Sequence, residues 1–162
     1  RDTYKMQDYG VSKAVSFVDC GIPSTANMPD DQTVAVAKGA LEYLAKDDPD
    51  AIIVEFGDGL MGKYGVDPIL RDPQIQANVK LHIGCARDPV GAVGLADACK
   101  ALGLPIDVIA GPVTDNAVGK QIVEEYIGCI TYNAFNPSDE WLDLVLARWL
   151  EGHGITKNVK RA

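Results

Sequence analysis

The residues Ala51-Ile52-Ile53-Val54-Glu55-Phe56 form a short apolar run, and a glycine-rich stretch follows them from Gly57 to Gly65. Five of these six residues are apolar, which predicts a strand buried on both faces of a parallel sheet. Burying the Glu55 carboxylate costs free energy unless it meets a metal ion, a water molecule or a cation. Open α/β sheets bind their ligands at the carboxyl ends of their strands. Glu55 is therefore a candidate site residue, and the alternative is a strand-end glutamate turned toward solvent.

Similar apolar runs alternate with amphipathic stretches along the whole chain. Strands are predicted over Ala14–Val18, Ala51–Phe56, Val79–Cys85, Ile106–Ala110 and Cys129–Tyr132. Helices are predicted over Asp31–Lys46, Val90–Leu102, Asn116–Tyr126 and Ser138–Glu151, with Asp30 or Asp31 capping the first. This alternation predicts an α/β domain, a three-layer, doubly wound and mostly parallel sheet. We expect residues 1–152 to form one such domain and residues 153–162 a basic tail.

Composition narrows the class of protein. The 162 residues are 47% hydrophobic and carry a formal net charge of −8, which argues against a nucleic-acid partner. The four cysteines, at positions 20, 85, 99 and 129, include no closely spaced pair, so we expect reduced, half-buried thiols of the core rather than a zinc site or a redox dithiol. Because no apolar run approaches the roughly twenty residues of a membrane span, we expect no membrane association and a cytoplasmic location.

Four loops that follow predicted strands each carry an acidic residue together with glycine or proline. They are residues Asp19–Thr25, Glu55–Gly65, Ala86–Pro89 and Gly111–Asn116. Ordinary surface turns have the same composition. Four such loops at the carboxyl edge of one sheet nevertheless predict a binding site there.

The stretch Gly57 to Lys63 matches the phosphate-loop pattern G-x-x-x-x-G-K, but it is not expected to act as one. That motif needs Ser or Thr after the lysine as a Mg²⁺ ligand, and this chain has Tyr64. A helix must also begin there, and Gly65 and Pro68 oppose a continuous helix through that stretch.

Two phrases resemble a known class of enzyme. They are Phe17-Val18-Asp19-Cys20-Gly21-Ile22-Pro23-Ser24-Thr25 and Val54-Glu55-Phe56-Gly57-Asp58-Gly59, preceded by Arg1-Asp2. In this order they resemble P-loop NTPases of the dethiobiotin synthetase and cobyrinate amidase type, and the DUF1611 type of P-loop protein. In that class the phosphate loop precedes these phrases, so we expect this chain to be the later part of a larger domain, with its phosphate loop upstream of Arg1.

The resemblance implies an ATP-dependent and Mg²⁺-dependent ligase or phosphotransferase acting on a small acidic metabolite. It implies that Asp19 and Glu55 help to hold Mg²⁺, and that Lys63 and Thr25 act beside the acceptor substrate. The residues that would flank the nucleotide base are Ala86, Arg87, Asp88, Gly111 and Pro112. An apolar stripe from Trp141 to Trp149, typical of a core or a dimer interface, makes a homodimer a possible assembly.

Two other classes of function stay open. The first is a Rossmann-type domain that binds a nicotinamide cofactor or another small ligand, although no G-x-G-x-x-G opens a helix in this chain. The second is a regulatory module that kept the fold without catalysis. A doubly wound sheet supports many functions, so the fold class alone does not separate these alternatives.

Overall fold

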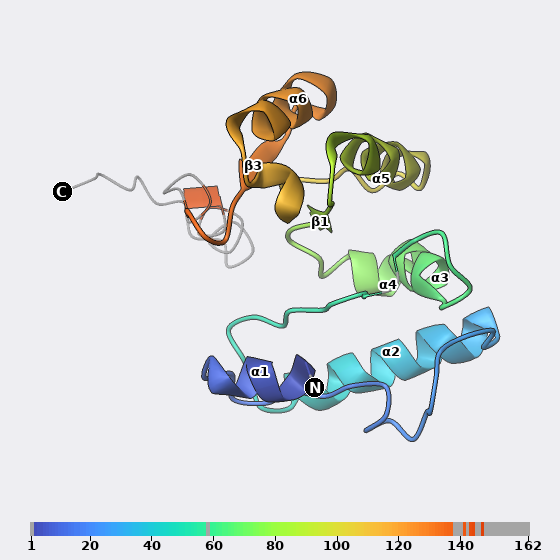
Figure 1. Ribbon diagram of the computed structural model, residues 1–162. Coiled ribbons are helices and arrows are strands. Elements are labelled where there is room, and N and C mark those ends of the chain that lie inside the picture. Colours follow the sequence, from blue (N-terminus) through green and yellow to red (C-terminus); the bar gives the residue numbers. More distant parts are fainter. Residues whose placement is uncertain (1, 58, 138–140, 142, 145–146, 148–162) are drawn as a thin grey trace. The chain divides into compact units, whose positions relative to one another are not determined.

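The computed structural model describes residues 2–57, 59–137, 141, 143–144 and 147. The chain divides into two compact units, Arg1–Ala77 and Asn78–Ala162, and each is described here by itself (Figure 1). The second unit contains a small parallel sheet with helices between its strands, which confirms the α/β class. That residues 1–152 form one domain stays a prediction.

The sheet of the second unit consists of β1 (Ile83–Cys85), β2 (Val108–Ala110) and β3 (Ile130–Tyr132). The strands are parallel in the order β1-β2-β3, with Ile83 opposite Val108 and Val108 opposite Ile130. Each strand lies inside a predicted apolar run but is only three residues long. The sequence therefore identified these three strands correctly and overestimated their lengths.

Two helices of the second unit follow the strands. Helix α5 (Pro89–Ala101) begins after Asp88, whose carboxylate accepts a hydrogen bond from the Gly91 amide at 2.9 Å. Helix α6 (Ala117–Ile127) begins after Asn116, whose side-chain oxygen accepts from the Gly119 amide at 2.8 Å. Such caps satisfy amides that have no partner inside the helix.

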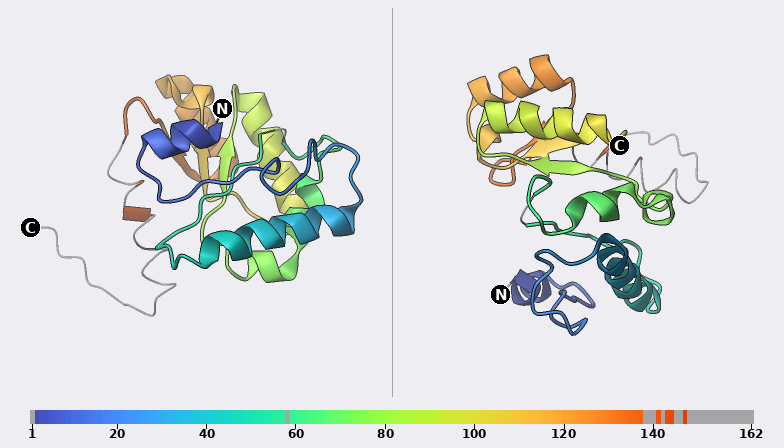
Figure 2. Two further views of the ribbon diagram at one scale, coloured as in Figure 1. Left: turned by 90° about the horizontal axis from the view of Figure 1, so that it is seen from below. Right: turned by 90° about the vertical axis from the view of Figure 1, so that its right-hand side faces the viewer.

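Helices α5 and α6 lie side by side over one face of the sheet (Figure 2). Between β2 and α6 the chain forms a short 3₁₀ helix, η1 (Pro112–Thr114). The apolar side chains that meet between the helices and the sheet are Ala86, Ala92, Ile109, Val113 and Val123. This core packs α5, η1 and α6 against β2.

The first unit contains α1 (Asp2–Asp8), α2 (Asp30–Ala45), α3 (Val66–Arg71) and α4 (Pro73–Gln76). Helix α2 was predicted within one residue, but its cap was not. Pro29 occupies the N-cap position without a side-chain hydrogen bond, and Asp30 and Asp31 lie in the first turn instead. Their negative charges still favour the helix, because they lie near the positive end of its dipole.

Two strand predictions in the first unit are wrong. Residues 14–18 and 51–56 have no regular secondary structure. An apolar run makes a strand favourable only where another strand pairs with it, and the described residues of this unit supply no such partner. As a result Ile53 is 82% exposed and Val54 53% exposed, instead of being buried on both faces.

The helix predicted over Ser138–Glu151 lies mostly outside the described residues, and the basic tail lies entirely outside them. The ring of Trp141 is described, and its centroid lies 4.6 Å from that of Tyr132, the last residue of β3. This contact is what a core aromatic residue makes. A dimer interface along the predicted stripe stays a prediction.

All four cysteines are free, but only part of the core prediction holds. Cys99 is buried and Cys129 is half-buried, and burial raises the pKa of both thiols. Cys20 and Cys85 are exposed, which corrects the expectation that all four belong to the core. Neither thiol is buried, because Cys20 lies in a turn and Cys85 occupies an exposed position of β1.

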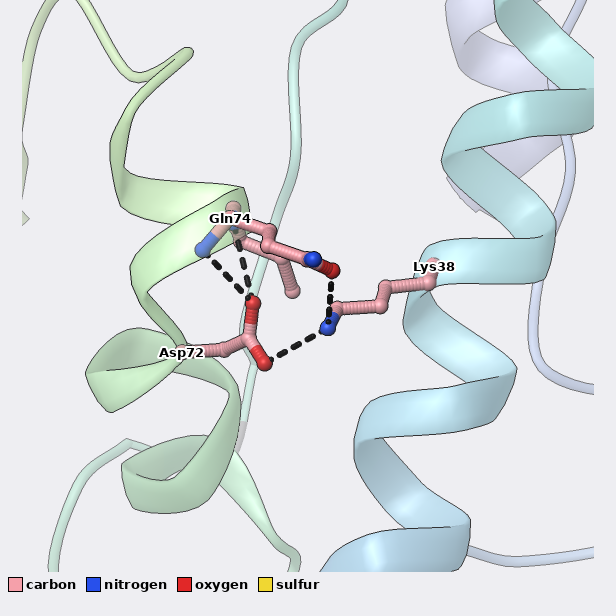
Figure 3. A network of polar contacts seen from close by, with 4 residues as sticks. Lys38, Asp72 and Gln74 are labelled. Carbon is pink, nitrogen blue, oxygen red and sulfur yellow. Dashed lines mark hydrogen bonds and ion pairs between the residues drawn. The ribbon is translucent and has the colours of Figure 1, made fainter.

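A polar network joins α2 to α4 in the first unit (Figure 3). The Asp72 carboxylate accepts hydrogen bonds from the amides of Gln74 and Ile75, and it forms an ion pair with the Lys38 ammonium at 2.7 Å. Lys38 also donates to the side-chain oxygen of Gln74 at 2.8 Å. The Lys38 hydrogen bond, followed by the amide contacts, lowers the pKa of Asp72 below its ordinary value of 3.8.

The Asp72→Asn variant is expected to be less stable than the parent chain at neutral pH. Because the folded-state pKa of Asp72 is lowered, the ionised group stabilises the fold above about pH 4, and this contribution is lost as the pH falls through the folded pKa. The difference between variant and parent should therefore shrink below about pH 4. Urea unfolding between neutral and acid pH measures it, with Asp67→Asn as the control, since Asp67 pairs with Arg71 on an exposed helix surface. A difference that stays constant at acid pH would contradict the ion pair.

Candidate functional site

The loops after β1 and β2 meet at the carboxyl edge of the sheet in the second unit. The Ala86 amide donates to the Ala110 carbonyl at 3.0 Å, and the Val113 amide donates to the Ala86 carbonyl at 3.2 Å. Three residues predicted to flank a nucleotide base, Ala86, Gly111 and Pro112, are thus brought together. That these residues flank a nucleotide base stays a prediction, but they do lie close to one another.

Gly111 makes this approach possible. Its φ is +93°, and a Cβ atom at this position would lie 2.8 Å from the carbonyl oxygen of Ala86. Only glycine adopts such a conformation without strain and leaves room for a neighbouring backbone. The sequence signal was therefore a glycine directly after a strand, which marks a close approach of two loops.

The other two predicted base-flanking residues, Arg87 and Asp88, are exposed. One carboxylate oxygen of Asp88 caps α5, so Asp88 has a structural role at the start of this helix. Arg87 follows Ala86 directly, and its cation lies on the surface near the same loop.

Asn133, the first residue after β3, holds the loops after β2 and β3 together. It is 7% exposed. Its side-chain nitrogen donates to the Thr114 carbonyl and to Asp115 Oδ1, both at 2.9 Å. Its side-chain oxygen accepts from the amides of Phe135 and Asn136, both at 2.9 Å. These contacts use both protons and both lone pairs of the amide, so Asn133 is saturated.

Thr114 completes this buried network. Its hydroxyl lies within hydrogen-bond distance of the Gly111 carbonyl, at 2.8 Å, and of the Tyr132 carbonyl, at 3.0 Å. The hydroxyl therefore ties the loop after β2 to the end of β3. A buried network whose members are all satisfied fixes the positions of the loops that it joins.

A hollow of about 510 Å³ opens beside this network at the start of α6. Its walls carry a carboxylate, a cation, several amides and an aromatic ring. The residues that line it are Thr114, Asp115, Asn116, Ala117, Lys120, Asn133, Phe135 and Asn136. Phe135 is 95% exposed at this place, so its ring is available to a ligand. Polar groups converging on a hollow at the carboxyl edge of a parallel sheet are typical of a small-molecule site.

Sequence reasoning found part of this wall and missed the rest. The loop Gly111–Asn116 was among the four predicted site loops, whereas Lys120, Asn133, Phe135 and Asn136 were not predicted. The signal for the last three was present, because they directly follow a predicted strand, as the other site loops do. Lys120 lies one turn into α6 and carries no local signal.

The predicted magnesium ligands lie in the first unit. Asp19 Oδ2 accepts hydrogen bonds from the amide and the hydroxyl of Ser16, at 2.8 and 2.9 Å, and these bonds lower the pKa of Asp19. Glu55 is exposed. Among the described residues, no group of three or more His, Cys, Asp or Glu side chains could hold a metal ion by itself.

The loops of Thr25 and Lys63 come together in the first unit. The Asn27 amide donates to the Lys63 carbonyl at 2.8 Å, and the Met28 amide donates to the Thr25 carbonyl at 3.3 Å. Lys63 lines a second hollow of about 360 Å³, together with two carboxylates and several loop residues. The others are Asn27, Met28, Asp30, Gly62, Gly65, Asp67 and Pro68.

Helix α3 begins at Val66, three residues after Lys63, so no helix starts where a phosphate loop needs one. This agrees with the rejection of Gly57–Lys63 as such a loop. Gly65 precedes α3 and separates it from the rest of the glycine-rich stretch, as predicted, but the expectation that Pro68 interrupts a helix is wrong. Pro68 lies in the first turn of α3, where the missing amide proton costs nothing.

No helix in the described part of the chain is long and apolar enough to cross a membrane. Comparisons of the chain with protein-family models, with curated proteins and with solved structures found no match. A function for the chain therefore has to be inferred from its own residues and their geometry.

Proposed function

We propose that this chain is the nucleotide-binding part of a Mg²⁺-dependent enzyme of the P-loop NTPase type, a ligase or kinase acting on a small acidic metabolite with ATP or a related nucleotide. The observation that carries the proposal is the hollow at the start of α6. It lies at the carboxyl edge of a parallel sheet, where such proteins bind their ligands.

The composition of the hollow suits a purine nucleotide. An exposed aromatic ring such as that of Phe135 stacks on the face of a base. Asp115, Asn136 and Lys120 add acceptors and donors for the polar edge of the base. The volume, about 510 Å³, falls in the range of small-molecule pockets.

We further propose that the sheet belongs to a three-layer, doubly wound arrangement. Successive strand residues point to opposite faces, yet Val108 and Ile109 of β2 are both fully buried. A strand with both faces buried is typical of a parallel sheet covered by helices on both sides. This burial supports the larger fold.

The donor chemistry of the first unit fits the implied metal. Hydrogen bonds from Ser16 lower the pKa of Asp19, so its carboxylate stays ionised, and Glu55 offers a second exposed carboxylate. Mg²⁺ binds a few carboxylate oxygens and keeps its other positions for water and phosphate. When bound, the ion would neutralise phosphate charge. On this proposal Lys63, with Thr25 on the neighbouring loop, attracts the acidic acceptor.

Nuclear magnetic resonance of the ¹⁵N-labelled chain tests the proposal. Titration with the Mg²⁺ complexes of ATP and GTP analogues should shift the amide signals of residues 111–119 and 133–136. Ribose 5-phosphate, which has no base, should leave those signals unchanged. The absence of shifts in these two segments at millimolar nucleotide would overturn the proposed nucleotide site.

A pair of lysine variants sharpens this test. Lys120→Met removes the one cation among the residues that line the hollow, and it should weaken nucleotide binding about tenfold, the value of roughly one charge-assisted hydrogen bond. Lys100→Met removes the same charge from the last turn of α5 and should leave the affinity unchanged. Equal effects of the two variants would show a general charge effect instead of a site.

A further inference from the structure

We infer that the hollow at the start of α6 selects guanine over adenine through the carboxylate of Asp115, an inference that rests on the proposed nucleotide site. The position of this carboxylate, the chemistry of the two purine edges and the saturation of the neighbouring amide together support it.

The Asp115 carboxylate is oriented by a hydrogen bond from a buried side chain. Its Oδ1 accepts a hydrogen bond from the buried side chain of Asn133 at 2.9 Å, and Asn133 is itself fixed by the amides of Phe135 and Asn136. Asp115 is exposed and lines the hollow. The hydrogen bonds that the structure shows for the described residues leave its Oδ2 open, and Oδ1 keeps a second lone pair. The carboxylate is therefore oriented before a ligand arrives.

Guanine and adenine differ in what they offer such a group. The edge of guanine carries two neighbouring donors, the N1 proton and the 2-amino group, which match the two oxygens of a carboxylate. Adenine carries a lone pair at N1 and has no 2-amino group. Its N1 would therefore face the negative charge of Asp115. A site that leaves polar groups unpaired in this way discriminates strongly.

The amide of Asn133 does not take over the recognition. Both of its protons and both of its lone pairs are used inside the protein. Asp115 is then a side chain of the hollow with an oriented carboxylate oxygen to spare. Lys120, on the same wall, supplies a cation suited to the O6 acceptor that guanine has and adenine lacks.

Phe135 has a different role. Its ring is exposed at the hollow, and stacking on a ring face does not distinguish one purine from another. The Phe135→Ala variant should therefore weaken the binding of all purine nucleotides by about tenfold and leave their ranking unchanged.

Three nucleoside monophosphates that share the same ribose phosphate test the inference. GMP has both donors, IMP keeps the N1 proton and lacks the 2-amino group, and AMP has neither. Titrations followed by the amide signals of residues 111–119 and 133–136 should rank their affinities GMP, then IMP, then AMP. GMP should bind about tenfold or more tightly than AMP, as expected for one unpaired hydrogen bond and one repulsive contact.

The Asp115→Asn variant should bring the GMP to AMP affinity ratio close to one. Its side-chain oxygen can still accept from Asn133, so the network is kept, and its nitrogen would then meet the guanine donors unfavourably. Asp97→Asn, on the exposed surface of α5, is the matched control for charge and should keep the ratio of the parent chain.

The outcomes separate the two proposals. AMP binding at these residues as tightly as GMP would overturn the guanine preference and leave the nucleotide site standing. A preference that survives Asp115→Asn would overturn the assignment to Asp115. If none of the three nucleotides shifts these signals, both the preference and the nucleotide site fall.

Discussion

The Gly119→Ala variant is expected to lose about 2–3 kcal/mol of its free energy of unfolding. Gly119 is buried in the first turn of α6, and a Cβ atom there would collide with the carbonyl oxygen of Val113. That backbone has little freedom to move, because the Val113 amide donates to the Ala86 carbonyl. The collision therefore forces α6 away from the loop after β2.

Gly94→Ala is the matched control for this prediction. Gly94 lies inside α5, and a Cβ atom there would meet nothing within 4 Å. Alanine should instead stabilise that helix by about 0.5–1 kcal/mol, since it restricts the unfolded chain more than glycine does. Urea unfolding of both variants provides the measurement. A neutral or stabilising Gly119→Ala would mean that α6 is not seated against Val113 as described.

The Asn133→Ala variant is expected to lose about 2–4 kcal/mol of its free energy of unfolding. The substitution removes the side-chain partner of the Phe135 amide and of the Thr114 carbonyl, whereas the Asn136 amide keeps the Asn133 backbone carbonyl at 3.2 Å. It also opens a small cavity, because Asn133 is buried. Buried polar groups left without a partner account for most of the expected loss.

Asn136→Ala tests whether the effect belongs to the buried amide. Asn136 is exposed, and the contact that it makes with Asn133 uses its backbone, which alanine keeps. Its substitution should therefore change the stability by less than about 0.5 kcal/mol. If Asn133→Ala and Asn136→Ala were equally mild in urea unfolding, the network at the carboxyl edge would not be formed in solution.

The sequence located β1 and β2 readily because each apolar run is followed by a helix with a marked N-terminus. Asp88 and Asn116 each cap the helix that follows them, so local chemistry and global fold agree there. The runs at residues 14–18 and 51–56 have equally apolar residues but form no strand. Strand formation depends on a partner that is distant in sequence, which a local pattern does not reveal.

The same distinction applies to the candidate site. The loops of Ala86 and Gly111 were correctly predicted to meet, because loops that follow neighbouring parallel strands lie at the same edge of the sheet. Asn133 was missed, since its importance comes from hydrogen bonds to Thr114 and Asp115, which lie 19 and 18 residues earlier in the chain. The role of such a buried amide becomes apparent only when the partners of both its nitrogen and its oxygen are known.

The hydrogen bonds of Asn133 also bear on how this protein can change during evolution. Its side-chain oxygen accepts from the backbone amides of Phe135 and Asn136, so these contacts do not depend on the side chains at the two positions. On the proposed function, substitutions at either position would alter which ligand is bound while the loop keeps its conformation. The fold thus separates the part that must be inherited unchanged from the part that can diversify. Related chains with different ligands should vary at positions 135 and 136 and retain asparagine at position 133.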